Sequence, residues 1–248
     1  GSFSAAGRAL GCTPSAVSRQ MARLEQALGS RLLERSTRSL RLTQEGALFL
    51  EHCRPALAAL QHLMVLDSAP EAEFDALVRA ASAVCGVPIS VISLIDSDRQ
   101  WFKANVGLPG VMETPRDVAF CSHAVLGDDL FEVPDAASDP RFADNPLVTG
   151  APSVRFYAGA PVQLSGGHRV GTLCIIDRKP RSLSEDQREI LRSLAIAASQ
   201  ALEGRQASLR LRQSEDFLDR TGRVAGIGGW EVDVASGEVT WSDETRRI

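Results

Sequence analysis

Residues 13–28 combine short hydroxyl side chains and arginines at helical spacing. Apolar residues recur there every three or four positions, which predicts an amphipathic helix with one apolar stripe: Val17, Met21, Leu24 and Leu28. Short side chains let a helix approach a major groove closely, and Arg and Ser donate hydrogen bonds to base edges and phosphates. The pattern predicts a DNA-recognition helix whose contacts lie at its start and on its polar face, namely Thr13, Pro14, Ser15, Ser18, Arg19 and Arg23.

Start and stop signals flank this helix. Thr13 can cap its first amides, Pro14 suits a first position that needs no N–H, and Gly29 suits a left-handed residue after the last turn. Residues 2–10 predict a preceding short helix and residues 11–13 a tight turn, which together predict a helix-turn-helix. Two short strand-like pieces around residues 36–39 predict a hairpin wing, with arginines for phosphate or minor-groove contacts: Arg35, Arg38 and Arg41.

Residues 1–62 resemble the winged helix-turn-helix of LysR-type transcription regulators. The resemblance rests on Ser2-Phe-Ser-Ala-Ala, Pro14-Ser-Ala-Val-Ser-Arg-Gln, Leu28-Gly-Ser-Arg-Leu-Leu-Glu-Arg and Leu42-Thr-Gln-Glu-Gly. It implies that helix and wing bind double-stranded DNA, and that the next long helix forms a homodimer contact. We expect the family's first helix to be missing before Gly1, and Pro55 to kink or end the dimer helix. The alternative is a generic three-helix segment whose arginines are simply solvated.

Charge and composition limit the class of protein. The first 64 residues hold eight Arg and four Glu, a net charge of +4, whereas the whole chain carries a formal charge of −4. A basic head on an acidic body suits nucleic-acid binding joined to regulation. No apolar run is long enough to predict a membrane span. The five cysteines lack Cys-x-x-Cys spacing, which suits reduced thiols in the cytoplasm.

The middle of the chain predicts an α+β domain. An amphipathic helix over residues 70–85 is followed by strands over 89–95 and 100–106, a short helix over 120–126 and a short strand over 131–133. Two further strands cover 155–164 and 169–176, and a long helix begins near residue 184. This order predicts an antiparallel sheet with helices on one face.

Residues 66–204 resemble a bacterial GAF domain. The resemblance is carried by Phe120-Cys-Ser-His, Asp139-Pro-Arg-Phe-Ala-Asp-Asn-Pro, Arg155-Phe-Tyr-Ala-Gly-Ala-Pro and Gly171-Thr-Leu-Cys-Ile-Ile-Asp. It implies a sensory module that binds a small molecule, carries a chromophore or serves as a dimer scaffold. The fold does not name the ligand, so the small-molecule signal and any cofactor stay unknown.

A candidate ligand pocket is predicted within these motifs. Its walls would be Trp101, Phe120, Phe156 and Tyr157, with Cys121, His123, Asp135 and Arg141 at the polar positions. The alternative is that these residues are core and loop contacts.

Other chemistry at the cysteines is weakly supported. Ser122 separates Cys121 from His123, which argues against bilin attachment because bilin-carrying GAF domains place Cys directly before His. Metal-ligand spacing is absent, so no metal site is predicted. Cys121 and Cys174 suggest a third option, a redox enzyme, but the sequence shows neither a lowered thiol pKa nor a resolving pair. We therefore expect buried, unreactive thiols and no catalytic residue.

The C-terminal part predicts a connecting helix and a hairpin. Residues 184–220 carry a capping pattern and apolar spacing that permits a coiled-coil-like dimer seam. Residues 221–248 resemble the opening hairpin of a PAS domain. The fold class is therefore multidomain: a mainly α winged helix-turn-helix, an α+β GAF domain, a linker helix and a partial PAS hairpin.

Two functions from different classes fit the sequence. The first is a cytoplasmic DNA-binding transcription regulator with GAF input, without enzyme activity in these residues. The second is the sensory front of a histidine kinase or diguanylate cyclase whose catalytic output lies beyond residue 248.

Overall fold

The computed structural model describes residues 2–9, 13–35, 40–225, 229–232, 236–241 and 245–246. The chain divides into two compact units, Gly1–Leu202 and Glu203–Ile248. Arg38 and the side chain of Arg35, both predicted wing contacts, lie outside what the structure describes.

The N-terminal elements follow the order helix, helix, hairpin, helix. They are α1 (Phe3–Ala9), α2 (Pro14–Leu28), β1 (Leu33–Arg35), β2 (Leu40–Leu42) and α3 (Gln44–His62). The Thr13 hydroxyl accepts a hydrogen bond from the Ala16 amide, and Gly29 ends α2 with φ +63°. These are the predicted caps, so the start and end of α2 follow from local sequence. α1 packs on α2, and β1 pairs antiparallel with β2.

Of the two expected effects of Pro55, ending the helix does not occur, because α3 continues through Pro55 to His62; a kink there stays a prediction. A proline removes one helical hydrogen bond, and packing of the flanking turns can compensate for that loss. Leu60, Leu63 and Val65 are at most 2% exposed and belong to the same core as the sheet that follows. The last turn of α3 is therefore part of the hydrophobic core of the sheet domain.

The central domain is built on a six-stranded antiparallel sheet of order β5-β4-β3-β8-β7-β6. Its strands are β3 (Ile89–Ile95), β4 (Arg99–Val106), β5 (Glu113–Pro115), β6 (Phe131–Val133), β7 (Phe156–Gln163) and β8 (Arg169–Asp177). This confirms the predicted α+β class with an antiparallel sheet. The three strands β3, β8 and β7, which are neighbours in the sheet, are the most deeply buried.

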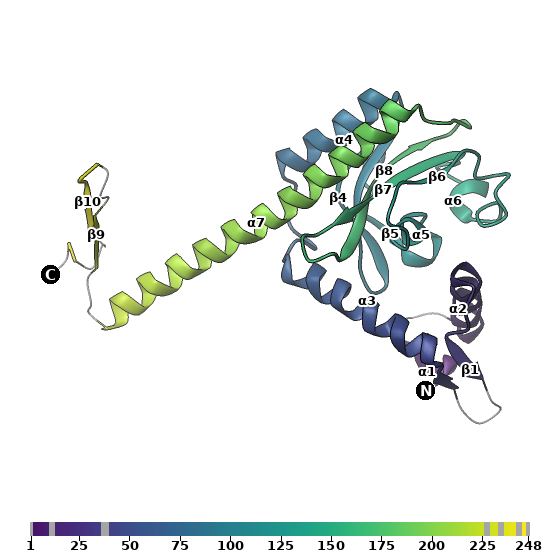
Figure 1. Ribbon diagram of the computed structural model, residues 1–248, viewed down its shortest axis with the longest axis horizontal. Helices are drawn as coiled ribbons and strands as arrows, with labels where there is room; N and C mark the ends of the chain where they lie inside the picture. Colours follow the sequence, from purple (N-terminus) through teal and green to yellow (C-terminus); the bar gives the residue numbers. More distant parts are fainter. Residues whose placement is uncertain are drawn as a thin grey trace. The chain divides into compact units, whose positions relative to one another are not determined.

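Two layers cover the two faces of the sheet (Figure 1). α4 (Ala72–Cys85) and the start of α7 (Glu185–Ala225) cover one face and form the helix-face core with residues such as Phe74, Leu94 and Leu191. The opposite face carries the 3-10 turn Arg116–Val118, the short helices α5 (Cys121–Ala124) and α6 (Pro146–Thr149), and loops, which form the loop-face core. The prediction of helices on one face therefore holds for the two long helices, while α5 packs on the other face.

A buried and a partly exposed set of polar contacts hold the segment between α3 and α4 against the sheet. The fully buried Lys103 ammonium donates to Ser68 Oγ at 2.9 Å, to the Ala69 carbonyl at 2.9 Å and to Glu71 Oε1 at 2.5 Å. Arg99 forms a bidentate pair with Asp67, with N–O distances of 2.7 and 3.0 Å. Because a buried cation is stable only when paired, these contacts hold the exit of α3 in one position.

Two short strands follow α7 in the described part of the chain. β9 (Trp230–Val232) pairs antiparallel with β10 (Val239–Trp241). Among the described residues, no helix is long and apolar enough to cross a membrane.

Candidate DNA-binding surface and sensory site

Helix α2 presents most of its predicted contact residues to solvent. Arg19, Arg23 and the start of the helix at Thr13, Pro14 and Ser15 are exposed, whereas Ser18 is partly buried. On the opposite side Val17 is only 8% exposed. The Thr13 and Ser15 hydroxyl oxygens lie 3.0 Å apart, so small polar groups cluster at the helix N-terminus. This end of a helix has unpaired amides and a partial positive charge, which favours an anion such as phosphate.

Side-chain contacts set the position of α2 relative to the hairpin that follows. Glu25 Oε1 accepts hydrogen bonds from the Leu32 and Leu33 amides at 2.8 and 2.9 Å. The Thr43 hydroxyl donates to the Arg31 carbonyl at 2.7 Å and accepts from the Gly46 amide at 2.9 Å. No role was predicted for Glu25 from the sequence. A lone carboxylate near the end of a helix, just before a strand, does indicate an acceptor for the amides of that strand.

The hairpin provides one described arginine. Arg41 is exposed on β2 and lies opposite Glu34 in the register of β1 and β2. An exposed arginine on a strand can contact a phosphate group.

On the loop face of the sheet, aromatic rings form a stacked cluster. The Phe120 ring stacks on Phe142 with centroids 4.2 Å apart and on Tyr157 with centroids 5.2 Å apart. His123 meets Phe142 edge-on at 4.9 Å, and Phe131 lies 6.1 to 6.4 Å from the Tyr157, Phe142 and His123 rings. We call these five residues the aromatic cluster. Such ring contacts add to the stabilisation from burial and hold the side chains in defined orientations.

Arg141 lies at the edge of this cluster. Its guanidinium is 5.0 Å from the Phe131 ring centroid and 5.3 Å from that of Phe142, and it pairs with Asp139 at 2.6 Å. Burial, together with the positive charge of Arg141, lowers the pKa of His123. His123 is therefore a neutral imidazole near pH 7, able both to donate and to accept a hydrogen bond.

The structure brings together only part of the predicted pocket. Phe120, Cys121, His123, Arg141 and Tyr157 share the loop face.

Trp101 and Phe156 belong to the helix-face core, so the prediction that they wall the same pocket is wrong. Phe156 and Tyr157 are neighbours on β7, and successive strand residues point to opposite faces.

The Asp135 carboxylate is occupied by an ion pair and is not available to the aromatic cluster as a free carboxylate. It accepts two hydrogen bonds from Arg155, at 2.7 and 2.9 Å, which lower its pKa to about 2.

Phe131 and Phe142 complete the aromatic cluster and were not predicted as site residues. Phe142 belongs to the Asp139-Pro-Arg-Phe motif, but the residues around it show neither a helical nor a strand repeat. The sequence therefore did not indicate which face of the sheet Phe142 would cover. Its place follows from the loop between β6 and β7 folding back over the sheet.

Two buried thiols lie next to the aromatic cluster. Cys121 Sγ is 3.8 Å from Cys174 Sγ, and the Tyr157 hydroxyl donates to Cys121 Sγ at 3.2 Å. Burial opposes ionisation of Cys121, whereas hydrogen bonds from Cys174, Ser93, Thr172 and Tyr157 act in the other direction and lower its pKa. The hydrogen bond to Cys121 and burial raise the pKa of Cys174. Both thiols are buried, as expected, and Cys174 lies close enough to Cys121 to be its partner thiol, a proximity that the sequence did not indicate.

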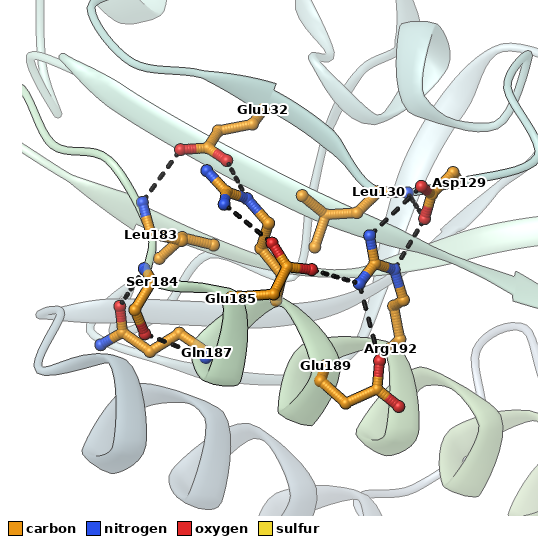
Figure 2. Close-up of polar contacts among 10 residues, drawn as sticks. Asp129, Leu130, Glu132, Leu183, Ser184, Glu185, Gln187, Glu189 and Arg192 are labelled. Carbon is orange, nitrogen blue, oxygen red and sulfur yellow. Dashed lines mark hydrogen bonds and ion pairs between the residues drawn. The ribbon is translucent and has the colours of Figure 1, made fainter.

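An ion-pair cluster joins the start of α7 to the β6 edge of the sheet (Figure 2). Glu132 accepts from Arg188 Nε at 3.0 Å and from the Leu183 amide at 3.0 Å. Arg192 pairs with Asp129 through contacts of 2.8 and 3.2 Å, and Glu185 accepts from both arginines. The Glu132 side chain is only 14% exposed, so its ion pair is less screened than a surface pair.

Strand β6 connects the aromatic cluster with this ion-pair cluster. Phe131 lies among the rings on the loop face, and the next residue, Glu132, contacts Arg188 of α7 and the Leu183 amide just before that helix. Because neighbouring strand residues point to opposite faces, a displacement of β6 changes both sets of contacts.

Two family comparisons agree with this architecture. The GAF domain family matches residues 69–202, which is more than half of the chain, and the chain belongs to this family. Residues 1–47 match the family of bacterial regulatory helix-turn-helix proteins of the lysR type.

Two relatives each match part of the chain. The GAF region is 46% identical over 131 residues to "Cyclic di-GMP phosphodiesterase PA2567" of Pseudomonas aeruginosa, covering 53% of this chain and 22% of that protein. A second relative, "Probable HTH-type transcriptional regulator LtrA" of Klebsiella pneumoniae, is 49% identical over 69 residues, covering 28% of this chain and 22% of that protein. The chain thus spans about a fifth of the length of each relative. The GAF domain of an Acinetobacter phosphoenolpyruvate-protein phosphotransferase aligns at 19% identity with a TM-score of 0.48, covering 64% of this chain and 95% of that one.

Proposed function

We propose that the chain is a cytoplasmic, homodimeric DNA-binding transcription regulator whose GAF domain supplies the signal input. The observation that carries the proposal is the capped helix α2, which exposes small hydroxyl side chains and two arginines within a region matched by the lysR-type family.

In this proposal α2 enters a major groove with its N-terminal end leading. Base edges are contacted by Ser15, Ser18 and Arg19. Phosphates are contacted by the helix N-terminus at Thr13 and Pro14. Phosphates are also contacted by four arginine side chains: Arg23, Arg35, Arg38 and Arg41. A bidentate arginine–guanine contact favours guanine over another base by roughly 1–3 kcal/mol. One arginine of α2 is therefore enough to change which DNA sequence is bound. A homodimer would present two such helices to two half-sites one helical turn apart.

The input would come from a small molecule that contacts the loop face of the GAF domain. There the buried rings of Phe120 and Tyr157 and the buried Cys121 thiol lie beside the half-buried, neutral imidazole of His123 and the exposed cation of Arg141. That combination favours a planar ligand with one anionic or hydrogen-bonding edge. A change in the aromatic cluster would reach α7 through β6, and α3 through the core that contains Leu60 and Leu63.

The proposal is tested by binding of the full chain to labelled DNA from upstream of its own gene, measured by fluorescence anisotropy over a series of salt concentrations. Arg19→Ala should weaken binding about 5- to 150-fold, the equivalent of roughly 1–3 kcal/mol, and lower the salt slope by about one. Arg79→Ala is the matched control, because Arg79 is an exposed arginine of α4 in the GAF domain. Equal affinities of the two variants would refute the assignment of α2.

A second candidate function rests on the 46% identity between the GAF region and a protein named as a cyclic di-GMP phosphodiesterase. In that case the chain is the sensory part of a signalling enzyme, such as a histidine kinase or diguanylate cyclase, with its output beyond residue 248. Full-chain binding to DNA that is insensitive to both salt and Arg19 would favour this alternative.

A further inference from the structure

Two cysteines distant in sequence meet in the interior of the GAF domain. Cys121 begins α5 and Cys174 lies in the middle of β8, and their sulfur atoms are 3.8 Å apart. A disulfide needs a separation of about 2 Å, so the sulfurs must approach by roughly 2 Å, which side-chain rotation with a small shift of α5 can supply.

Polar groups surround this pair in an otherwise apolar core. The Tyr157 hydroxyl donates to Cys121 Sγ at 3.2 Å, and Ser93 Oγ lies 3.1 Å from Thr172 Oγ1 on the adjoining strands. All three hydroxyl residues are fully buried. Buried hydroxyls that converge on a sulfur atom stabilise its anion, which is the nucleophilic form of the thiol.

Cys85 provides an internal comparison. It is also buried, but it lies on the other face of the sheet, in the helix-face core, and burial raises its pKa. In the described part of the chain Cys85 contacts no second thiol; it lies in the apolar helix-face core, and the Arg181 cation is the charged group near it. The contrast shows that the polar environment of Cys121 is local and does not follow from burial alone.

We infer that Cys121 and Cys174 form a redox-active dithiol that hydrogen peroxide, or another small hydroperoxide, converts to an intramolecular disulfide. Cys121 sulfur attacks one peroxide oxygen: an S–O bond forms, the O–O bond breaks, and the departing hydroxide leaves as water with the thiol proton. Cys174 sulfur then attacks the Cys121 sulfenic acid: the S–S bond forms, the S–O bond breaks, and a second water leaves with the Cys174 proton. Two thiols and one hydrogen peroxide thus give one disulfide and two waters, with two electrons passing to the peroxide; an organic hydroperoxide gives its alcohol and one water instead.

The position of the pair gives the modification a structural effect. α5 is a single helical turn that also carries His123 of the aromatic cluster. Closing the disulfide draws the start of α5 toward β8 and moves His123 against Phe142. The oxidation site and the proposed small-molecule site therefore share one element, although the dithiol requires neither DNA binding nor a ligand.

The experiment treats the reduced full chain with a few equivalents of hydrogen peroxide and follows the thiols by differential alkylation and peptide mass spectrometry. We expect a peptide pair cross-linked through Cys121 and Cys174, which a thiol reductant separates again, while Cys85 stays reduced. A non-reducing gel should show a monomeric chain, because the bond lies within one molecule.

Variants distinguish the role of Cys121, which attacks the peroxide, from that of Cys174, which closes the disulfide. Cys174→Ser should leave a sulfenic acid on Cys121 that dimedone captures, whereas Cys121→Ser should abolish peroxide consumption by the pair. Tyr157→Phe should slow disulfide formation by up to about tenfold, the factor that one lost hydrogen bond contributes, and Cys85→Ser should leave the rate unchanged. Circular dichroism confirms that each variant is folded.

The inference is overturned if Cys121 and Cys174 stay reduced in the folded chain while added glutathione in the same tube is oxidised. Disulfide formation only in denaturant overturns it as well, because the folded environment would then play no part. Oxidation of Cys85 at the same rate as Cys121 also contradicts it.

Discussion

At the residue scale, His123 is a titratable member of the aromatic cluster. Its imidazole stacks against Phe131 and meets Phe142 edge-on, and burial is the main cause of its lowered pKa. The Arg141 cation opposes protonation further, whereas Asp139 favours it. The folded state therefore prefers neutral His123 more strongly than the unfolded chain does.

This preference predicts a pH dependence of stability. The unfolded imidazole has a pKa near 6.5 and the folded value lies below it, so the contribution is complete above pH about 6.5 and is lost as pH falls through the folded pKa. We expect the free energy of unfolding by urea to fall between pH 7.5 and 5.5, and His123→Gln to reduce that fall. Arg141→Gln is the companion variant and should raise the His123 pKa in an NMR titration. An unchanged His123 titration in that variant would contradict the assigned environment.

At the element scale, the junction between β1 and α3 depends on a close backbone approach. A Cβ atom on Gly46 would lie 2.0 Å from the Leu32 carbonyl oxygen, so no other residue fits without movement of the chain.

Gly46→Ala should destabilise the helix-turn-helix by roughly 1–3 kcal/mol, the usual cost of forcing an atom into a packed site. Limited proteolysis should then cut within residues 1–47 while the GAF domain stays intact, and DNA binding should weaken. Gly204→Ala is the control, since nothing lies within 4 Å of a Cβ there and the change should stabilise α7 by up to about 1 kcal/mol. Equal proteolysis of the two variants would show that the approach at Leu32 is unimportant.

The ion-pair cluster makes a second prediction about an element, the start of α7. Glu132→Gln removes the carboxylate charge beside Arg188 but keeps an oxygen for the Leu183 amide. We expect faster hydrogen exchange over residues 184–192 and a loss of about 1 kcal/mol in stability, in the upper part of the range for partly exposed pairs.

Glu189→Gln provides the matched control for that change. Its carboxylate is 72% exposed and lies 3.6 Å from Arg192, so we expect almost no effect. High salt should reduce the difference between Glu132→Gln and the parent chain, because it screens the pair. A salt-independent difference would mean that packing, not charge, holds the start of α7.

At the scale of the whole molecule, α3 connects the N-terminal helix-turn-helix region to the GAF core. Leu60, Leu63 and Val65 are buried with the sheet residues, and Lys103 and Arg99 fix the segment that follows. A signal-dependent change in the GAF core therefore has a direct covalent route to α3.

A comparison of two fragments tests this shared core. A fragment covering residues 57–202 retains all three apolar side chains, whereas one covering residues 66–202 lacks them. Since each buried aliphatic side chain contributes roughly 1.5–3 kcal/mol, the shorter fragment should be several kcal/mol less stable to urea. Circular dichroism and urea midpoints give the measurement. Equal midpoints would mean that the last turn of α3 is dispensable for the GAF fold.

The sequence by itself determined the elements whose signals are local. Caps at Thr13 and Gly29 defined α2, and the apolar run over residues 89–95 defined β3, because helix and strand periods depend only on neighbouring residues. The motifs also predicted the two family resemblances, which the comparisons support.

Only the tertiary structure decided which side chains meet. Trp101 was assigned to the loop face of the sheet, but it lies on the helix face. Residues 101–104 show no clear alternation of apolar and polar side chains, and an irregularity in the pairing of β3 with β4 interrupts the alternation of faces there. Cys121 and Cys174 are 53 residues apart, and Glu132 and Arg188 are 56 apart, so their contacts depend on strand order and on where α5 and α7 pack. Local periodicity contains no information on such distances, because they arise from how the loops close over the two faces of the sheet.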